Sequence, residues 1–139
     1  MVTRLNPYLS FRDNAREAME FYQSVFGGEL TVSTFGEFQA SEDPAEKDKV
    51  MHSQLEATNG LVLMGADTPN SMDYNAGGDQ VSVSLSGEDN DELTGYWEKL
   101  SAGGTVQQPL TAAPWGDSFG MCDDKYGVHW LVNISGSPA

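Results

Sequence analysis

The sequence predicts a single α+β domain built from two copies of one β-α-β-β-β module. Its 139 residues are enough to bury a core without disulfides or metal ions. A strand, a helix start and a double glycine recur 76 residues apart, and beyond the helix the offset between matching residues falls to 67. The matched positions are Asp13 with Asp89, Gly27-Gly28 with Gly103-Gly104, and Gly60 with Gly127.

The first module opens with a predicted strand, in which Leu5, Leu9 and Phe11 alternate with polar residues. Asp13 or Asn14 then supplies the N-cap of a helix, which a double glycine ends. Three further strands are expected over 29–35, 50–57 and 61–64, the last two joined by an Asn-Gly turn. The apolar residues at helical spacing are Ala15, Ala18, Met19, Tyr22, Val25 and Phe26.

Two polar stretches interrupt this pattern. Residues 36–49 are polar with mixed charge, which is typical of a mobile excursion. Residues 66–80 contain proline and the pair Gly77-Gly78, which is typical of a linker. The predicted organisation is therefore module one over 1–65, a linker over 66–80 and module two over 81–135.

The second module repeats the opening pattern, with apolar and serine residues alternating over 81–86. A helix carrying Leu93, Trp97 and Leu100 follows and ends at a double glycine. Strands are expected over 105–107, 118–122 and 128–134. Side by side, two such modules would form a curved eight-stranded mixed sheet, a cup with both helices on its outer face.

Composition excludes several classes of function. Seven basic residues stand against 21 acidic ones, giving a formal charge of -14, so neither nucleic acid nor an anionic membrane is an expected partner. The acidity indicates a well-solvated surface or, alternatively, a salt-adapted host. With one cysteine, no apolar run near ~20 residues and no signal-peptide core, we expect a cytoplasmic protein.

The inner face of the predicted cup is polar, with Asn6, Tyr8 and Ser10 from the first strand and matching serines in the second module. Buried hydroxyls need hydrogen-bond partners, so a polar inner face suits a wet pocket. The alternative is an antiparallel sheet whose serines simply face solvent.

Several stretches of the chain together match the pattern of one known family. They are 6–11, 15–22 with Phe26-Gly27-Gly28, Met51-His52, Leu63-Met64, 115–117 with Phe119-Gly120, and 123–130 with Asn133. In these stretches the chain resembles the PhnB-like branch of the vicinal-oxygen-chelate superfamily, which includes glyoxalases, bleomycin-resistance proteins and extradiol dioxygenases. This resemblance spans nearly the whole chain and implies the glyoxalase-like fold and a homodimer.

Metal-dependent members of that superfamily hold a divalent ion with His and Glu side chains. The resemblance places those positions at Asn6, Met64, Ser82 and Leu131, and the two repeat offsets relate them in pairs. Asn and Ser are weak neutral donors, Met suits soft ions and Leu cannot ligate. We therefore expect no metal site and no cofactor.

Other residues leave alternatives open. His52 and His129 could bind a metal at another position or act as acid and base, or they could be hydrogen-bonded sheet residues. Cys122 could be a nucleophile, although a small buried residue needs no such role. Trp115 lies in a loop before a strand, where it could gate the cup or anchor the loop.

The sequence favours a protein that binds a small organic molecule in the cup without a metal. The alternative is a lyase, isomerase or dioxygenase of the glyoxalase type that uses His52 as base or metal ligand, and a purely structural dimer is a third possibility. The methyltransferase label attached to the PhnB-like branch is rejected, because the Gly-rich first turn of a nucleotide-binding sheet is missing. The expected pocket residues are Tyr8, His52, Gln54, Met64, Ser82, Trp115 and Phe119.

Overall fold

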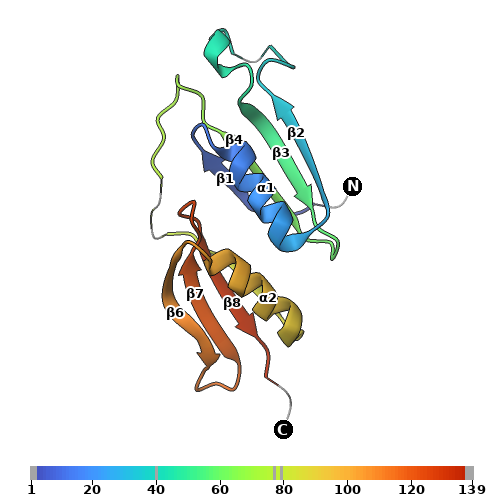
Figure 1. The fold of residues 1–139 in the computed structure, drawn as a ribbon, viewed down its shortest axis with the longest axis vertical. Coiled ribbons are helices and arrows are strands. Elements are labelled where there is room, and N and C mark those ends of the chain that lie inside the picture. Colours follow the sequence, from blue (N-terminus) through green and yellow to red (C-terminus); the bar gives the residue numbers. More distant parts are fainter. Residues whose placement is uncertain (1–2, 40, 77, 79, 137–139) are drawn as a thin grey trace. The chain divides into compact units, whose positions relative to one another are not determined.

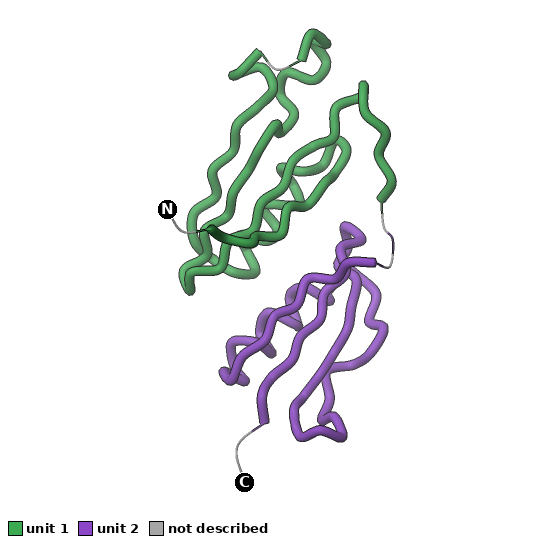
Figure 2. The backbone as a smooth tube through the Cα atoms, turned by 180° about the vertical axis from the view of Figure 1, so that it is seen from behind, with its two compact units in different colours: residues 1–76 green, residues 77–139 purple. Residues whose placement is uncertain are grey.

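The structure is a computed structural model that describes residues 3–39, 41–76, 78 and 80–136. The chain divides into two compact units, residues 1–76 and 77–139 (Figure 2). Each unit contains the strands and the helix of one predicted module, together with part of the predicted linker 66–80. Gly77 of the predicted linker lies outside the described residues.

The first unit is a four-stranded mixed sheet with one helix on one face (Figure 1). The strand order is β1-β4-β3-β2, in which β1 and β4 are parallel and the other neighbours antiparallel. Its elements are β1 (Tyr8–Phe11), α1 (Ala15–Phe26), β2 (Glu29–Thr34), the 3-10 turn η1 (Pro44–Glu46), β3 (Val50–Glu56) and β4 (Val62–Asp67).

The second unit has the same topology, with strand order β5-β8-β7-β6 and a parallel β5/β8 pair. The predicted α+β fold of two β-α-β-β-β modules is confirmed. The joining of both sheets into one cup stays a prediction. The elements of this unit are β5 (Val83–Gly87), α2 (Asn90–Ser101), β6 (Thr105–Ala112), β7 (Ser118–Asp123) and β8 (His129–Ile134).

The strand registers reproduce both repeat offsets. Tyr8 pairs with Met64 in the first sheet, and Ser84 pairs with Leu131 in the second. Ser84 lies 76 residues after Tyr8, and Leu131 lies 67 residues after Met64. The hairpin turns agree as well, since the Gly60 N–H donates to Ala57 just as the Gly127 N–H donates to Asp124. The duplication therefore holds at the level of individual hydrogen bonds.

The double glycine after each helix has a packing cause. A Cβ on Gly28 would lie 2.0 Å from the Glu56 carbonyl oxygen, and one on Gly104 would lie 2.1 Å from that of Asp123. Both distances are far inside van der Waals contact. Each helix can therefore return to its sheet only where the chain lacks a side chain.

Both helices bury one apolar stripe against their own sheet. The six apolar residues predicted to line α1 are all buried, and Leu93, Trp97 and Leu100 are buried on α2. Burying a large apolar side chain stabilises a fold by roughly 1.5–3 kcal/mol. Among the described residues, neither module has a second α-helix that would cover the opposite face of its own sheet.

The start of α1 differs from the prediction. Asn14 is the N-cap residue but makes no side-chain capping bond, and Asp13 has a positive φ of 74°. The first helical N–H, that of Ala15, instead donates to Asp67 Oδ1 at 3.0 Å. Asp67 ends β4, so that strand runs two residues into the predicted linker. Asp13 forms an ion pair with Lys49.

The start of β1 and the polar segment 36–49 also differ from the prediction. The first strand begins at Tyr8, and Leu5 is fully exposed. The Pro7 carbonyl still accepts a hydrogen bond from the Met64 N–H of β4 at 3.1 Å. The polar segment 36–49 contains η1, whose Glu46 is only 3% exposed. Glu46 accepts hydrogen bonds from the Ser41 hydroxyl and the Asn70 N–H, which ties η1 to the segment after β4.

No helix in the described part of the chain is long and apolar enough to span a membrane.

Candidate functional site

Four predicted pocket residues lie on the first sheet, on the face opposite α1. Tyr8 pairs with Met64, and Met64 pairs with Gln54, so these side chains form one row across β1, β4 and β3. His52 lies two residues before Gln54 on β3 and shares its face. Because Phe11, Leu55 and Leu63 are buried on the helix side, we call the other side, with Tyr8, His52, Gln54 and Met64, the open face of the first sheet.

Tyr8 and His52 form a pair across this face. The Tyr8 hydroxyl oxygen lies 3.0 Å from His52 Nδ1. The ring centroids are 5.6 Å apart and the ring planes are inclined by 28°, a stacked arrangement. Tyr8 belongs to β1 and His52 to β3, so the contact bridges β4, which lies between them. Tyr8 remains 50% exposed and His52 is half-buried.

Partial burial affects the protonation of Tyr8. Partial burial raises the pKa of the Tyr8 phenol above its ordinary value, so the phenol keeps its proton. The Tyr8 O–H can then donate to Nδ1 of a neutral His52 ring. Beside this pair, the Gln54 amide Nε2 donates to Glu56 Oε1 at 3.1 Å. The open face thus combines aromatic surface with a few polar groups.

The other three predicted pocket residues belong to the second unit. Phe119 lies on β7, where it pairs with Asn133. Trp115 is 62% exposed and packs edge-on against Phe119, with ring centroids 5.8 Å apart. Ser82 is exposed and precedes β5. A pocket lined by all seven residues stays a prediction.

The loop that carries Trp115 is held by its acidic neighbour Asp117. Asp117 Oδ2 accepts a hydrogen bond from the Asn133 amide at 3.0 Å, and Oδ1 accepts one from the Gly136 N–H at 2.9 Å. The Asn133 bond, followed by the Gly136 bond, lowers the pKa of Asp117. These two bonds anchor the loop through Asp117, whereas both roles considered for Trp115, gating the cup and anchoring the loop, stay predictions.

At the positions that the resemblance assigns to metal ligands, the side chains present do not fit a divalent cation. Leu131 has no donor atom and Met64 offers only a thioether, while Asn6 and Ser82 are neutral. Within residues 3–39, 41–76, 78 and 80–136, no group of three or more His, Cys, Asp or Glu side chains could hold a metal ion.

The second histidine is engaged differently from His52. His129 Nδ1 lies 2.5 Å from Asp123 Oδ1, and Nε2 lies 2.5 Å from the Gly78 carbonyl oxygen. Both ring nitrogens of His129 therefore face oxygen acceptors within the second unit. This arrangement matches the hydrogen-bonded sheet residue that the sequence left as one alternative.

Cys122 is buried on the helix side of β7. Burial, with smaller contributions from Asp124 and Asp123, raises the pKa of its thiol to about 11. A protonated, inaccessible thiol is a poor nucleophile. Asp124 itself is buried, and it accepts bonds from the Trp130 indole and from two N–H groups of its own turn.

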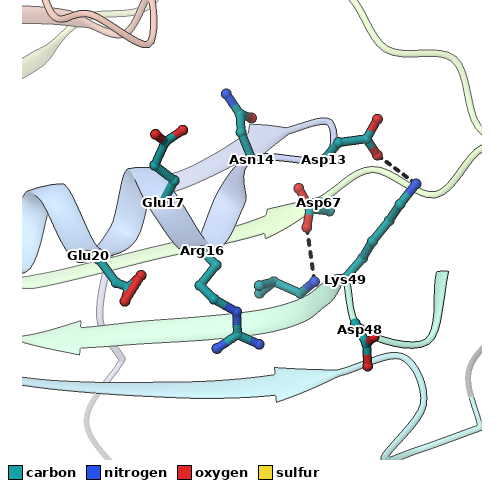
Figure 3. A pocket seen from close by; sticks show the side chains of 9 residues that line it. Asp13, Asn14, Arg16, Glu17, Glu20, Asp48, Lys49 and Asp67 are labelled. Atoms are coloured by element: carbon teal, nitrogen blue, oxygen red, sulfur yellow. Dashed lines mark hydrogen bonds and ion pairs between the residues drawn. The ribbon is translucent and has the colours of Figure 1, made fainter. Parts of the chain in front are cut away.

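A hollow of about 420 Å³ lies at the start of α1, on the helix side of the first unit (Figure 3). Lys49 Nζ is 2.6 Å from Asp13 Oδ1 at its rim. Asp67 accepts the N–H of Ala15 with one oxygen and that of Val50 with the other. This use of Asp67 was not predicted from the sequence, although an acidic residue at the end of an apolar strand was a usable signal. The hollow is lined by Asp13, Asn14, Arg16, Glu17, Glu20, Asp48, Lys49, Val50 and Asp67.

Comparison with solved structures identifies the fold. A protein from Pseudomonas aeruginosa, PA1353, is 36% identical to this chain, with 98% of this chain and 100% of that one aligned at a TM-score of 0.83. A Bacillus cereus PhnB protein, described as a putative 3-demethylubiquinone-9 3-methyltransferase, is 25% identical over 96% of this chain and 100% of its own, at a TM-score of 0.72.

A glyoxylase/bleomycin resistance protein/dioxygenase domain from Frankia shares the fold at 14% identity, with 97% of this chain and 98% of that chain aligned and a TM-score of 0.67. The model of the 3-demethylubiquinone-9 3-methyltransferase family matches residues 3–133. The chain therefore belongs to this PhnB-like family, and it shares its fold with proteins described as glyoxalase/bleomycin resistance/dioxygenase members.

Proposed function

We propose that the open face of the first sheet binds a small, flat organic molecule, without a metal ion. The observation that carries this proposal is the stacked and hydrogen-bonded Tyr8–His52 pair on a sheet face that its own helix leaves uncovered. Aromatic surface with a few oriented polar groups is typical of small-molecule sites. Met64 adds an adaptable apolar contact in the same row.

The proposal is tested by NMR titration of the full chain with a panel of flat aromatic compounds. The expected result is a set of saturable shift changes centred on Tyr8, His52, Gln54 and Met64. In His52→Ala the affinity should fall by about tenfold, since stacking and one hydrogen bond are lost. Ser33→Ala, which removes the hydroxyl of the β2 residue that pairs with His52, is the matched control. Changes confined to other surfaces would contradict the proposal.

A second candidate is an enzyme of the lyase, isomerase or dioxygenase type that uses His52 as base or metal ligand. It is favoured by one observation, the presence of a half-buried imidazole beside a phenol on the open face. Titration with zinc separates the candidates. Selective broadening of the His52 resonances at stoichiometric zinc would favour the enzyme, and an unchanged spectrum would favour metal-free binding.

Methyl transfer, which the family's name describes, is not what we propose. The described strands form two four-stranded mixed sheets with one helix each, not a doubly wound parallel sheet. Addition of S-adenosylmethionine is therefore expected to leave the spectrum unchanged. Saturable binding of this cofactor would reverse the choice.

We further propose that the protein acts in the cytoplasm as a homodimer and binds neither nucleic acid nor membrane. The charge of -14 supports the last two points. Light scattering at micromolar concentration measures the oligomeric state, and a monomer mass would contradict the dimer.

A further inference from the structure

We infer that Tyr8 is a positioning residue that keeps the proton of neutral His52 on Nε2, so that the open face offers one oriented N–H donor. We also infer that the site selects a flat, uncharged molecule with a carbonyl or ring-nitrogen acceptor. The second inference rests on the proposed function. The first concerns the protein without ligand and stands apart from it.

The direction of the Tyr8–His52 hydrogen bond decides the position of the proton. A neutral imidazole carries one N–H and one acceptor nitrogen. The phenol oxygen lies 3.0 Å from Nδ1, and burial favours the protonated phenol. When the Tyr8 O–H donates, Nδ1 must be the acceptor, and the ring hydrogen is then on Nε2.

The stacked geometry also restrains the ring. The His52 ring is stacked against the Tyr8 ring, with ring centroids 5.6 Å apart and ring planes inclined by 28°. Rotating the imidazole by half a turn would replace Nδ1 with a carbon and lose the hydrogen bond. Tyr8 thus sets both the orientation of the ring and the nitrogen that carries the hydrogen.

The surrounding charges narrow the class of ligand. Glu56 accepts a bond from Gln54 on the same face, and the chain carries a formal charge of -14. A carboxylate ligand would be repelled by this field. An N–H donor beside an aromatic surface therefore suits a neutral acceptor attached to a flat ring, such as an aromatic ketone.

The first experiment measures the His52 tautomer by long-range ¹H–¹⁵N NMR in the absence of ligand, at a pH where the spectrum shows a neutral ring. The expected wild-type pattern is protonated Nε2 and unprotonated Nδ1. In Tyr8→Phe, the Nδ1 resonance should move toward that of the tautomer mixture of free histidine. Tyr96→Phe on α2 is the matched control and should leave His52 unchanged.

A wild-type ring protonated on Nδ1, or the same tautomer in Tyr8→Phe as in the wild type, would overturn the positioning role. Tyr8 is half exposed and loses only its hydroxyl, so the variant should fold. Its ¹H–¹⁵N spectrum checks this directly.

The second experiment compares three probes of similar size, which are acetophenone, ethylbenzene and benzoate. Acetophenone should bind about three- to tenfold more tightly than the other two, the worth of one hydrogen bond. His52→Phe keeps an aromatic ring but should remove this preference.

Equal binding of acetophenone and ethylbenzene, or a preference for benzoate, would overturn the ligand class. If no probe shifts the open face, both the ligand class and the proposed function fail, whereas the tautomer measurement is unaffected.

Discussion

The two modules share their backbone pairing but not their polar chemistry. Tyr8 and Ser84 hold the same register position against β4 and β8, respectively. By the offset of 67, His52 matches Phe119. The first module therefore carries a phenol–imidazole pair where the second carries a hydroxyl and a phenyl ring. The strand pairing is the same in both modules because it depends on main-chain hydrogen bonds. The exposed side chains are not constrained in this way and differ between the modules.

The helix starts show the same contrast. Asp89 caps α2 from within its own segment by accepting the Glu92 N–H at 3.0 Å. At α1, the carboxylate comes from Asp67, 52 residues after Ala15, and also accepts the Val50 N–H at 2.9 Å. Asp67 is 5% exposed, whereas Asp89 lies at the surface. One helix therefore starts on a local signal and the other on a tertiary contact.

This contrast predicts the largest effect. Asp67→Ala leaves two N–H groups near the core without their acceptor, so the free energy of unfolding should fall by about 3 kcal/mol. Asp89→Ala removes one exposed cap and should cost about 1 kcal/mol. Urea unfolding followed by circular dichroism measures both values. Equal losses would remove the distinction between the local and tertiary caps.

The next effect is expected at the double glycine that follows α2. Gly104→Ala places a Cβ 2.1 Å from the Asp123 carbonyl oxygen, so the chain must shift, at a cost of roughly 2 kcal/mol. Gly95→Ala is the matched control, since a Cβ there meets nothing within 4 Å and alanine favours the helix by about 1 kcal/mol. Thermal unfolding should therefore shift in opposite directions, and a neutral Gly104→Ala would contradict the close approach.

Cys122 predicts a loss of stability at high pH. Its pKa is about 11 in the folded chain, above that of an unfolded thiol near ~8.5. Stability from the buried thiol is thus complete below the unfolded value and is lost as pH rises through about 11. The urea midpoint of the wild type should fall more steeply over this range than that of Cys122→Ala. Parallel curves would show that the thiol is not desolvated.

The smallest effect is expected at Asp117. Its pKa is lowered by Asn133 and Gly136, so its contribution is present above the ordinary carboxyl pKa and is lost as pH falls through the depressed value. Asp117→Asn should reduce the difference between the unfolding midpoints at pH 6 and pH 3. Asp91→Asn, an exposed residue in the first turn of α2, is the control. An unchanged difference in Asp117→Asn would argue against the loop anchor.

Much of the candidate site could be predicted from alternation along the strands. Period-two spacing assigned Tyr8, His52 and Gln54 to the face opposite the helix, because successive strand side chains point to opposite faces. Met64 was placed there by the family resemblance and the repeat offset. The Tyr8–His52 contact itself could not be predicted. Tyr8 and His52 meet across β4. Their contact depends on the strand order β1-β4-β3, which alternation along a single strand does not reveal.

By itself, the sequence determined the α+β modules, the extent of both helices, their buried stripes and the glycines that end them. These features depend on local periodicity and on chain geometry, and both can be recognised from the order of residue types. The tertiary structure alone decided the strand order, the cap that Asp67 provides and the partners of the two histidines. Those contacts join residues far apart in the chain, and their formation depends on packing that no local pattern encodes.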